Sequence, residues 1–191
     1  DAVIKYSKNI LDFFSKYPTK AVVIACNTAS AVAYNIIKKE YSLPIFDVVS
    51  PSVEFAIHQT ETNNVGVIGT TSTIGSHAYS QQFKYKSKDC AVYEIACPLF
   101  VPLIEEGWAD TAIAGEIANI YLIQFENKNI DRLILGCTHY PIMASTIKSI
   151  LPDDIKLVFP GDTVGEKLYN YLQANNLFNT SSYHGNIEFF V

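Results

Sequence analysis

Two cysteines of this chain stand in similar surroundings. Cys26 follows the apolar run at 21–25, Cys137 follows the run at 132–136, and a threonine comes within two positions of each. A short apolar run predicts a buried strand, and the residues after each cysteine predict a helix start. The free N–H groups of a helix start bind carboxylates and favour a thiolate. The repeated pattern therefore predicts two thiols facing a small acidic molecule, one removing a proton from carbon and the other delivering one.

Polar side chains beside these cysteines add hydrogen-bonding groups without charge. Asn27, Thr28 and Thr138 flank the two cysteines, and Thr73 follows a third apolar run at 64–69. Each threonine could equally be a helix cap, because its hydroxyl can accept a hydrogen bond from a free N–H of the first turn. His139 could be a helix-start histidine and Glu105 a solvated helix residue, whereas Cys90 and Cys97 are predicted to be buried small apolar residues.

Composition excludes several other classes of function. The formal net charge is −5 and the longest basic run is Lys38-Lys39, followed by Glu40, so we expect no nucleic-acid partner. No apolar segment approaches the ~20 residues that span a bilayer, and no signal peptide is visible, so a cytoplasmic location with free thiols is expected. Neither a C-x-x-C pair nor a G-x-G-x-x-G fingerprint occurs. We therefore predict no metal site and no dinucleotide cofactor.

Short apolar runs alternate with longer amphipathic stretches along the chain. Strands or extended segments are predicted at 21–25, 43–49, 64–69, 92–96, 132–136 and 156–159, the first of them covered on both faces. Helices are predicted at 2–17, 29–41, 52–59, from about 73 to 83, and at 100–105, 111–125, 142–151 and 164–174. This alternation predicts an α/β fold of parallel sheets flanked by helices. Ligands of such folds bind at the carboxyl ends of the strands, where both cysteines stand.

Four motifs together resemble bacterial glutamate racemases of the aspartate/glutamate racemase superfamily. They are ACNTAS at 25–30, GVIGTTSTIGSHAY at 66–79, CPLFVPLIEEG at 97–107 and LILGCTHYP at 133–141. Aspartate racemases typically carry Cys-Thr-Glu-Ile-Pro where this chain has Cys137-Thr138-His139-Tyr140-Pro141. The histidine, with the segment 100–105, favours glutamate over aspartate as the small-molecule substrate.

The resemblance implies an architecture and a role for each site residue. It implies two pseudo-symmetric lobes, 1–48 plus 161–191 and 49–160, with the active site in the cleft between them. Cys26 would act on the α-hydrogen of D-glutamate and Cys137 on that of L-glutamate, without a cofactor. His139 and Glu105 match the auxiliary acid/base groups of the family. The residues implied to hold the substrate are Asn27, Thr28, Thr73 and Thr138. D-Glutamate would feed peptidoglycan synthesis, and a homodimer is left open.

The sequence also departs from the family pattern. The Asp-Ser-Gly loop and Pro-Tyr-Gly turn that precede the first helix in the family do not occur, and residues 189–191 read as an incomplete strand. We therefore expect this stretch to be poorly active by itself. Two alternatives stay open: an aspartate racemase or another superfamily member, and a truncated, non-catalytic binding domain.

Overall fold

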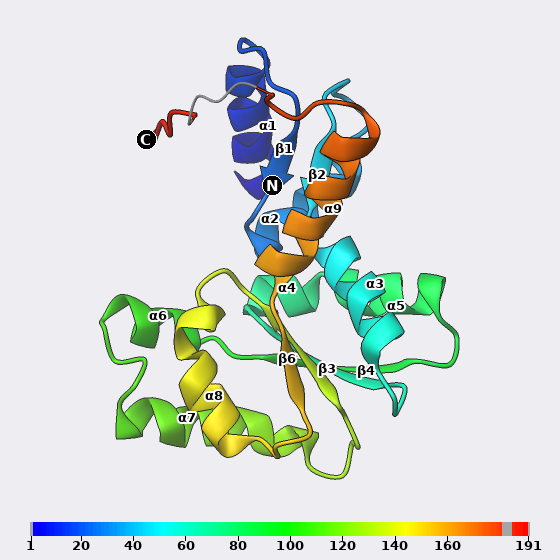
Figure 1. Cartoon of the computed structure of the whole chain (residues 1–191). Coiled ribbons are helices and arrows are strands. Elements are labelled where there is room, and N and C mark those ends of the chain that lie inside the picture. Colours follow the sequence, from blue (N-terminus) through cyan, green and yellow to red (C-terminus); the bar gives the residue numbers. More distant parts are fainter. Residues whose placement is uncertain (1, 181–184, 191) are drawn as a thin grey trace.

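Two parallel sheets organise the chain in this computed structural model, which describes residues 2–180 and 185–190 (Figure 1). In the smaller sheet, β1 (Val22–Ile24) pairs with β2 (Ile45–Asp47). The larger sheet has the order β4-β3-β5-β6. Its strands are β3 (Asn64–Gly69), β4 (Ala91–Ala96), β5 (Arg132–Gly136) and β6 (Lys156–Val158). Every strand pairing in the described part of the chain is parallel, which confirms the predicted α/β class.

Helices connect the strands and cover both faces of the larger sheet. They are α1 (Ala2–Phe14), α2 (Asn27–Ile37), α3 (Val49–Gln59), α4 (Thr71–Gly75), α5 (Ala78–Lys86), α6 (Phe100–Glu105), α7 (Ala112–Leu122), α8 (Ala144–Ile150) and α9 (Pro160–Ala174), with 3₁₀ turns η1 (Ile123–Phe125) and η2 (Tyr140–Met143). Described residues form no helix that is long and apolar enough to cross a membrane.

Several predicted helix boundaries were wrong, each for a local reason. The helix predicted from about 73 to 83 is two helices, because His77 adopts a left-handed conformation with φ 57° and breaks the run between α4 and α5. The helix predicted from 52 begins at Val49, because the Asp47 carboxylate accepts hydrogen bonds from the backbone N–H groups of Val49 and Ser50. The helix predicted from 164 begins at Pro160, whose missing N–H costs nothing in a first turn.

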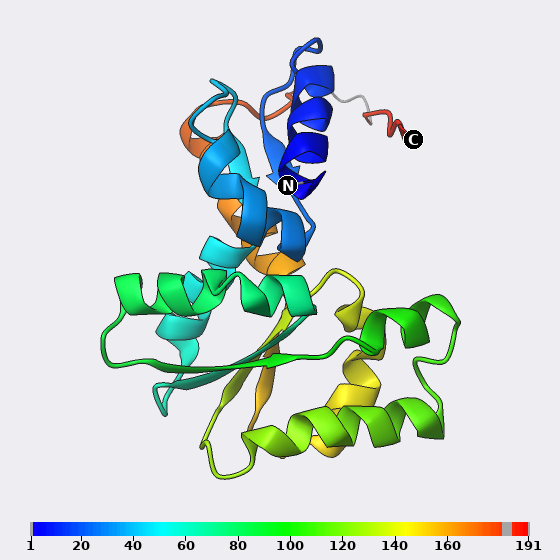
Figure 2. The same cartoon turned by 180° about the vertical axis from the view of Figure 1, so that it is seen from behind.

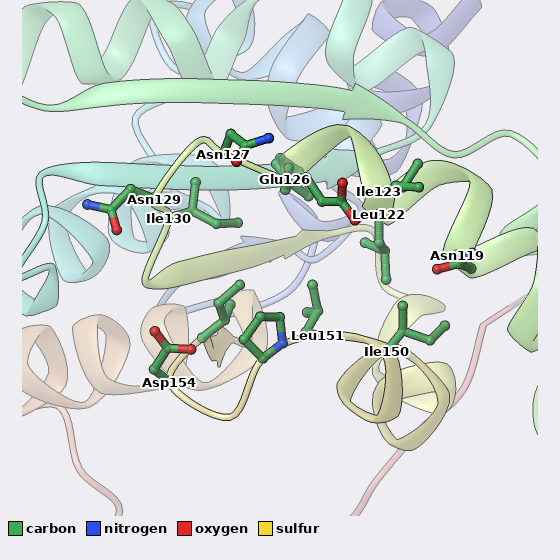
Figure 3. A pocket seen from close by; sticks show the side chains of 13 residues that line it. Asn119, Leu122, Ile123, Glu126, Asn127, Asn129, Ile130, Ile150, Leu151 and Asp154 are labelled. Atoms are coloured by element: carbon green, nitrogen blue, oxygen red, sulfur yellow. The ribbon is translucent and has the colours of Figure 1, made fainter.

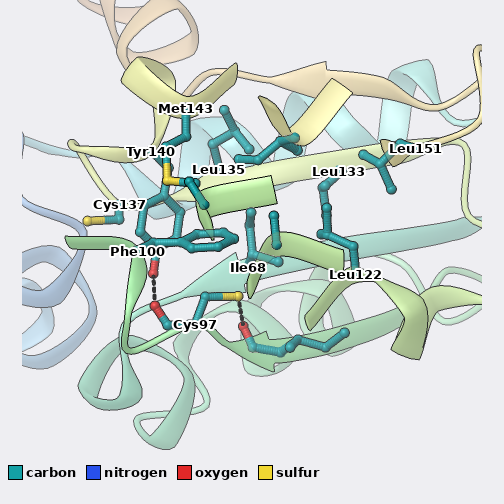
Figure 4. Packing of buried hydrophobic residues seen from close by; sticks show 14 of the residues in the cluster. Ile68, Cys97, Phe100, Leu122, Leu133, Leu135, Cys137, Tyr140, Met143 and Leu151 are labelled. Carbon is teal, nitrogen blue, oxygen red and sulfur yellow. Dashed lines mark hydrogen bonds between the residues drawn. The ribbon is translucent and has the colours of Figure 1, made fainter. Parts of the chain in front are cut away.

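The larger sheet separates two apolar layers. Successive side chains of a strand point to opposite faces, so Ile68, Leu133 and Leu135 pack against α6, α7 and α8, as Figure 4 shows in part. Val67 and Ile134 face the other way, toward α3 and α5. Figure 2 shows α5 and α7 on opposite sides of this sheet. The layers hold β3 and β5 so that both strands end near α4 and α5.

The smaller sheet is less buried than predicted. All three residues of β1 are half-buried rather than covered on both faces, because β1 pairs only with β2 among the described residues. Its core consists of Leu11, Ala33, Ile37 and Ile45.

The strand predicted at 189–191 is wrong for the described part. Residues 189 and 190 have no regular structure, and the ring of Phe190 packs against Phe13, Phe14 and Tyr17 instead. Val191 lies outside the described residues.

Two helices link the sheets. The chain passes from the smaller sheet to the larger through α3 and returns through α9 (Figure 1). These helices contact each other, and the Ser52 and Thr163 hydroxyls lie 3.0 Å apart in the buried contact. Glu54 adds ion pairs to Lys86 at 2.7 Å and Lys167 at 3.0 Å. The sheets therefore share a packed junction, and lobe boundaries at 48 and 161 stay a prediction.

Candidate active site

Cys26 lies between the end of β1 and the first turn of α2. Its backbone is extended, with φ −69° and ψ 120°, and it occupies the N-cap position without a side-chain cap hydrogen bond. Its carbonyl accepts the first helical bond, from the Ser30 N–H at 2.9 Å. The thiol is exposed. A reactive group thus stands at the positive end of an 11-residue helix, as the sequence predicted.

Cys137 occupies the matching position after β5, but it is buried. Burial raises the pKa of its thiol, and the charge of Cys26 raises it further. Hydrogen bonds from the backbone N–H groups of His139 and Tyr140 and from the Thr138 side chain lower it, without reversing the shift. Two conclusions follow. Cys26 lies close enough for its charge to act on Cys137, and Cys137 favours the protonated form that a proton donor needs.

His139 connects Cys137 to Glu105. One ring nitrogen, Nδ1, lies 3.9 Å from the Cys137 Sγ, and the other, Nε2, lies 3.3 Å from Glu105 Oε1. An Nε2–H that donates to the carboxylate leaves Nδ1 as the acceptor for the thiol proton. The side chain of Glu105 is 64% exposed, so its pairing with His139 is screened by water. The geometry suits a histidine that assists Cys137 and a carboxylate that orients the ring.

Three threonine hydroxyls form a triangle where the two sheets meet. The Thr28 Oγ1 lies 3.0 Å from that of Thr70 and 3.1 Å from that of Thr73, and the Thr70 and Thr73 oxygens are 3.0 Å apart. Thr70, rather than Thr28 or Thr73, is the helix cap, since its hydroxyl accepts from the Thr73 N–H at the start of α4. Sequence reasoning missed Thr70 as a site residue. The signal was the threonine that directly follows a buried strand and precedes a helix.

Asn27 is buried, and only one of the two polar groups of its side-chain amide has a hydrogen-bond partner among the described residues. Its Oδ1 accepts a hydrogen bond from the Tyr79 hydroxyl at 2.6 Å. Its Nδ2 has no hydrogen-bond partner within the described part of the chain. A buried donor without a partner costs about 1–3 kcal/mol, so its persistence calls for a functional reason. Tyr79 is a second residue that the sequence analysis did not assign to the site.

The residues predicted for the site fall into two groups. Cys26, Asn27, Thr28 and Thr73 gather where α2 meets α4, and Cys137, Thr138, His139 and Glu105 gather at the end of β5. The charge interaction between Cys26 and Cys137 joins the groups. In the described ranges, no three His, Cys, Asp or Glu side chains are placed to hold a metal ion. The individual roles of these eight residues stay predictions.

A cavity of about 620 Å³ lies away from the cysteines (Figure 3). It opens at the amino ends of β5 and β6, where Ile130 and Ile155 precede the strands, and its rim carries Glu126 and Asp154. None of the predicted site residues lines it. Because ligands of parallel α/β sheets bind at the carboxyl ends, this cavity is not the candidate site.

Comparison with known proteins decides the family. Residues 7–162 match the family model described as Asp/Glu/Hydantoin racemase, which is most of the chain. The chain belongs to this family. A glutamate racemase from Thermoanaerobacter sp. (strain X514) is 42% identical over all 191 residues, which cover 71% of that relative. The chain is therefore a glutamate racemase family member by sequence, as the motifs predicted.

Solved structures of glutamate racemases have the same fold. The structure of the Francisella tularensis enzyme in complex with D-glutamate matches with a TM-score of 0.88 and 40% identity, over 95% of this chain and 67% of that one. Isoform RacE1 from Bacillus anthracis matches with a TM-score of 0.88 and 32% identity, over 92% of this chain and 66% of that one. The chain thus spans about two thirds of these solved racemases.

Proposed function

We propose that this chain carries the two-thiol active site of an enzyme that interconverts L-glutamate and D-glutamate without a cofactor. The observation that carries the proposal is the pair of cysteines, each directly after a parallel strand, with Cys26 close enough for its charge to raise the pKa of Cys137. When two groups exchange the roles of acid and base, the protonation of one is expected to influence the pKa of the other.

The reaction is a proton transfer across the two faces of the α-carbon. Starting from D-glutamate, the Cys26 thiolate takes the α-hydrogen as a proton and leaves the electron pair on the substrate. The Cys137 thiol delivers its proton to the opposite face, which gives L-glutamate and a Cys137 thiolate. The reverse reaction exchanges the two roles. Charge and protons balance, and no oxidant or reductant is needed.

The α C–H bond is a weak acid, so the site must stabilise the electron pair that develops on the carboxylate. Preorganised hydrogen-bond donors aimed at that charge lower the barrier most effectively. Candidates are the backbone N–H groups at the start of α2, the Thr28 and Thr73 hydroxyls and the unpartnered Nδ2 of Asn27. Thr138 is exposed beside Cys137, to which its side chain also hydrogen-bonds, and is a candidate contact with the substrate from the other side.

The two thiols have different surroundings. Cys26 is exposed at a helix start, whereas Cys137 is buried and has a raised pKa. His139 lies on the Cys137 side alone, where it accepts the thiol proton when Cys137 acts as the base. This asymmetry supports Cys137 as the first proton donor. The assignment of Cys26 to D-glutamate and of Cys137 to L-glutamate is the one that the family resemblance implies.

Glutamate is the proposed substrate rather than aspartate, because the relatives that share 32–42% identity with this chain are glutamate racemases. The product D-glutamate would serve peptidoglycan synthesis in the cytoplasm. A homodimer stays a prediction.

Removal of either thiol tests the proposal in the complete protein. Cys26→Ala and Cys137→Ala are each expected to abolish racemisation, followed as the circular dichroism of glutamate over time. Cys90→Ala is the matched control, since Cys90 is a buried cysteine away from the site.

Near wild-type turnover by either single variant would refute the two-thiol reaction. Faster racemisation of aspartate than of glutamate by the wild type would refute the substrate. Binding of glutamate without turnover by the wild type would favour the non-catalytic alternative.

A further inference from the structure

We propose that Tyr79 is a positioning residue for this reaction: its hydroxyl fixes the Asn27 amide so that Asn27 offers Nδ2 to a substrate carboxylate. The inference rests on the proposed function and deepens it. Tyr79 belongs to α5, outside both cysteine segments, and its side chain is fully buried.

The Tyr79 side chain contacts both cysteine-bearing segments. Its hydroxyl donates to Oδ1 of Asn27, the residue after Cys26, at 2.6 Å. Its ring lies against Gly136, the residue before Cys137: a Cβ at Gly136 would come within 3.3 Å of the ring and 2.6 Å of the Ile68 carbonyl oxygen. The Ile68 carbonyl therefore requires glycine at 136, and the Tyr79 ring packs closely against that glycine. One rigid side chain thus spans the two strand ends from which the thiols project.

The Tyr79 hydroxyl is the donor of the Tyr79–Asn27 hydrogen bond, and its surroundings keep the proton that it donates. Burial raises the pKa of Tyr79 far above its usual value, and the charges of Asp47, Glu94 and Cys137 raise it further. The hydroxyl therefore keeps its proton at any working pH and acts as a donor.

A donating hydroxyl occupies the amide oxygen of Asn27, so only the amide nitrogen is left for another group. That nitrogen has no hydrogen-bond partner among the residues the structure describes. A donor without charge at the start of α2 suits a carboxylate oxygen. If the amide rotated by half a turn, it would offer an acceptor there instead and repel the carboxylate. The Tyr79 hydroxyl opposes that rotation, because its proton and the Asn27 Oδ1 would then both lose the hydrogen bond that they share.

Tyr79→Phe in the complete protein tests the inference, because it removes the hydroxyl and keeps the ring over Gly136. Tyr93→Phe is the matched control: the Tyr93 hydroxyl also donates to an asparagine oxygen, Asn64 Oδ1 at 3.3 Å, at the opposite end of the sheet. Tyr79→Phe is expected to lower kcat/KM by about tenfold, the effect of one oriented hydrogen bond. Tyr93→Phe should retain the wild-type value.

A double-mutant cycle separates positioning from packing. If Tyr79 acts through Asn27, the double variant Tyr79→Phe/Asn27→Ala has the same kcat/KM as Asn27→Ala alone. Additive losses, or a Tyr79→Phe variant as active as Tyr93→Phe, would overturn the inference and leave the proposed function standing. A wild type that does not racemise glutamate would instead overturn the proposed function, and the inference with it.

Discussion

At the scale of single residues, Cys26 and Cys137 are the proposed reactive groups, and the hydroxyls of Thr70 and Tyr79 contact the two residues after Cys26. Cys26 and Cys137 could be recognised because both follow an apolar run and precede polar residues. Thr70 and Tyr79 were missed because their importance depends on contacts with Thr28 and Asn27, more than 40 positions away in the chain. The local pattern could mark Thr70 as a helix cap, but it could not show the contacts of Thr70 and Tyr79 with these distant residues. The family resemblance implied that His139 and Glu105 are auxiliary acid/base groups but did not pair them, and the structure places the two side chains in contact.

The contributions of His139 and Glu105 are expected to differ in size. His139→Gln should lower kcat/KM by about 10²-fold, since it removes a proton-transferring group. Glu105→Gln should lower it by no more than about fivefold, because an exposed ion pair contributes less than about 1 kcal/mol. Glu106→Gln, at the neighbouring exposed glutamate, is the control. Steady-state kinetics in both directions measure the effects. A Glu105→Gln loss as large as that of His139→Gln would show that the carboxylate does more than orient the ring.

At the scale of elements, strands were predicted more accurately than helices. The bounds 64–69 and 132–136 are correct because each strand is a buried apolar run that ends at a glycine. Helix starts were misplaced where a side chain or proline fixes the first turn, as at Val49 and Pro160. Where α4 begins matters most for the site, because the Thr70 cap holds the first turn of that helix against Thr28.

Thr70→Ala is expected to reduce both stability and activity. Loss of the N-cap acceptor should lower the free energy of unfolding by about 1 kcal/mol. The same change removes one corner of the threonine triangle and should lower kcat/KM. Thr111→Ala is the matched control, because Thr111 caps α7 through the Ala114 N–H, away from the cysteines. Denaturant unfolding and racemisation assays measure the two effects. Equal activity of the two variants would mean that the triangle does not support the site.

At the scale of the whole molecule, the sequence predicted an α/β fold but not how its two sheets meet. The hydroxyl contact of Ser52 with Thr163 and the pairing of Glu54 with Lys86 and Lys167 join segments far apart in the chain. Three titratable side chains are buried around the larger sheet. They are the thiol of Cys97 and the hydroxyls of Tyr79 and Tyr140, and burial raises the pKa of each.

Because of these buried groups, we expect the folded protein to lose stability at alkaline pH. Burial raises the pKa of Cys97 from 9.0 to about 12. A group with a higher pKa in the folded protein stabilises it fully below the unfolded pKa, and this stability is lost as pH rises through the folded pKa. Thermal unfolding should therefore show a midpoint that falls between about pH 9 and pH 12. Cys97→Ala should flatten this decline. An unchanged slope in the variant would contradict the assignment to Cys97.

The account as a whole depends on the claim that two different thiols serve the two faces of the α-carbon. Racemisation of D-glutamate in deuterated water, followed at early times by mass spectrometry of the separated enantiomers, tests it most directly. Cys137 would deliver a solvent-derived deuteron to the product, whereas Cys26 would return to the substrate only the proton it had removed. We therefore predict deuterium in newly formed L-glutamate and none in the remaining D-glutamate. Equal deuterium in both enantiomers from the start would indicate a single base and contradict the two-thiol mechanism.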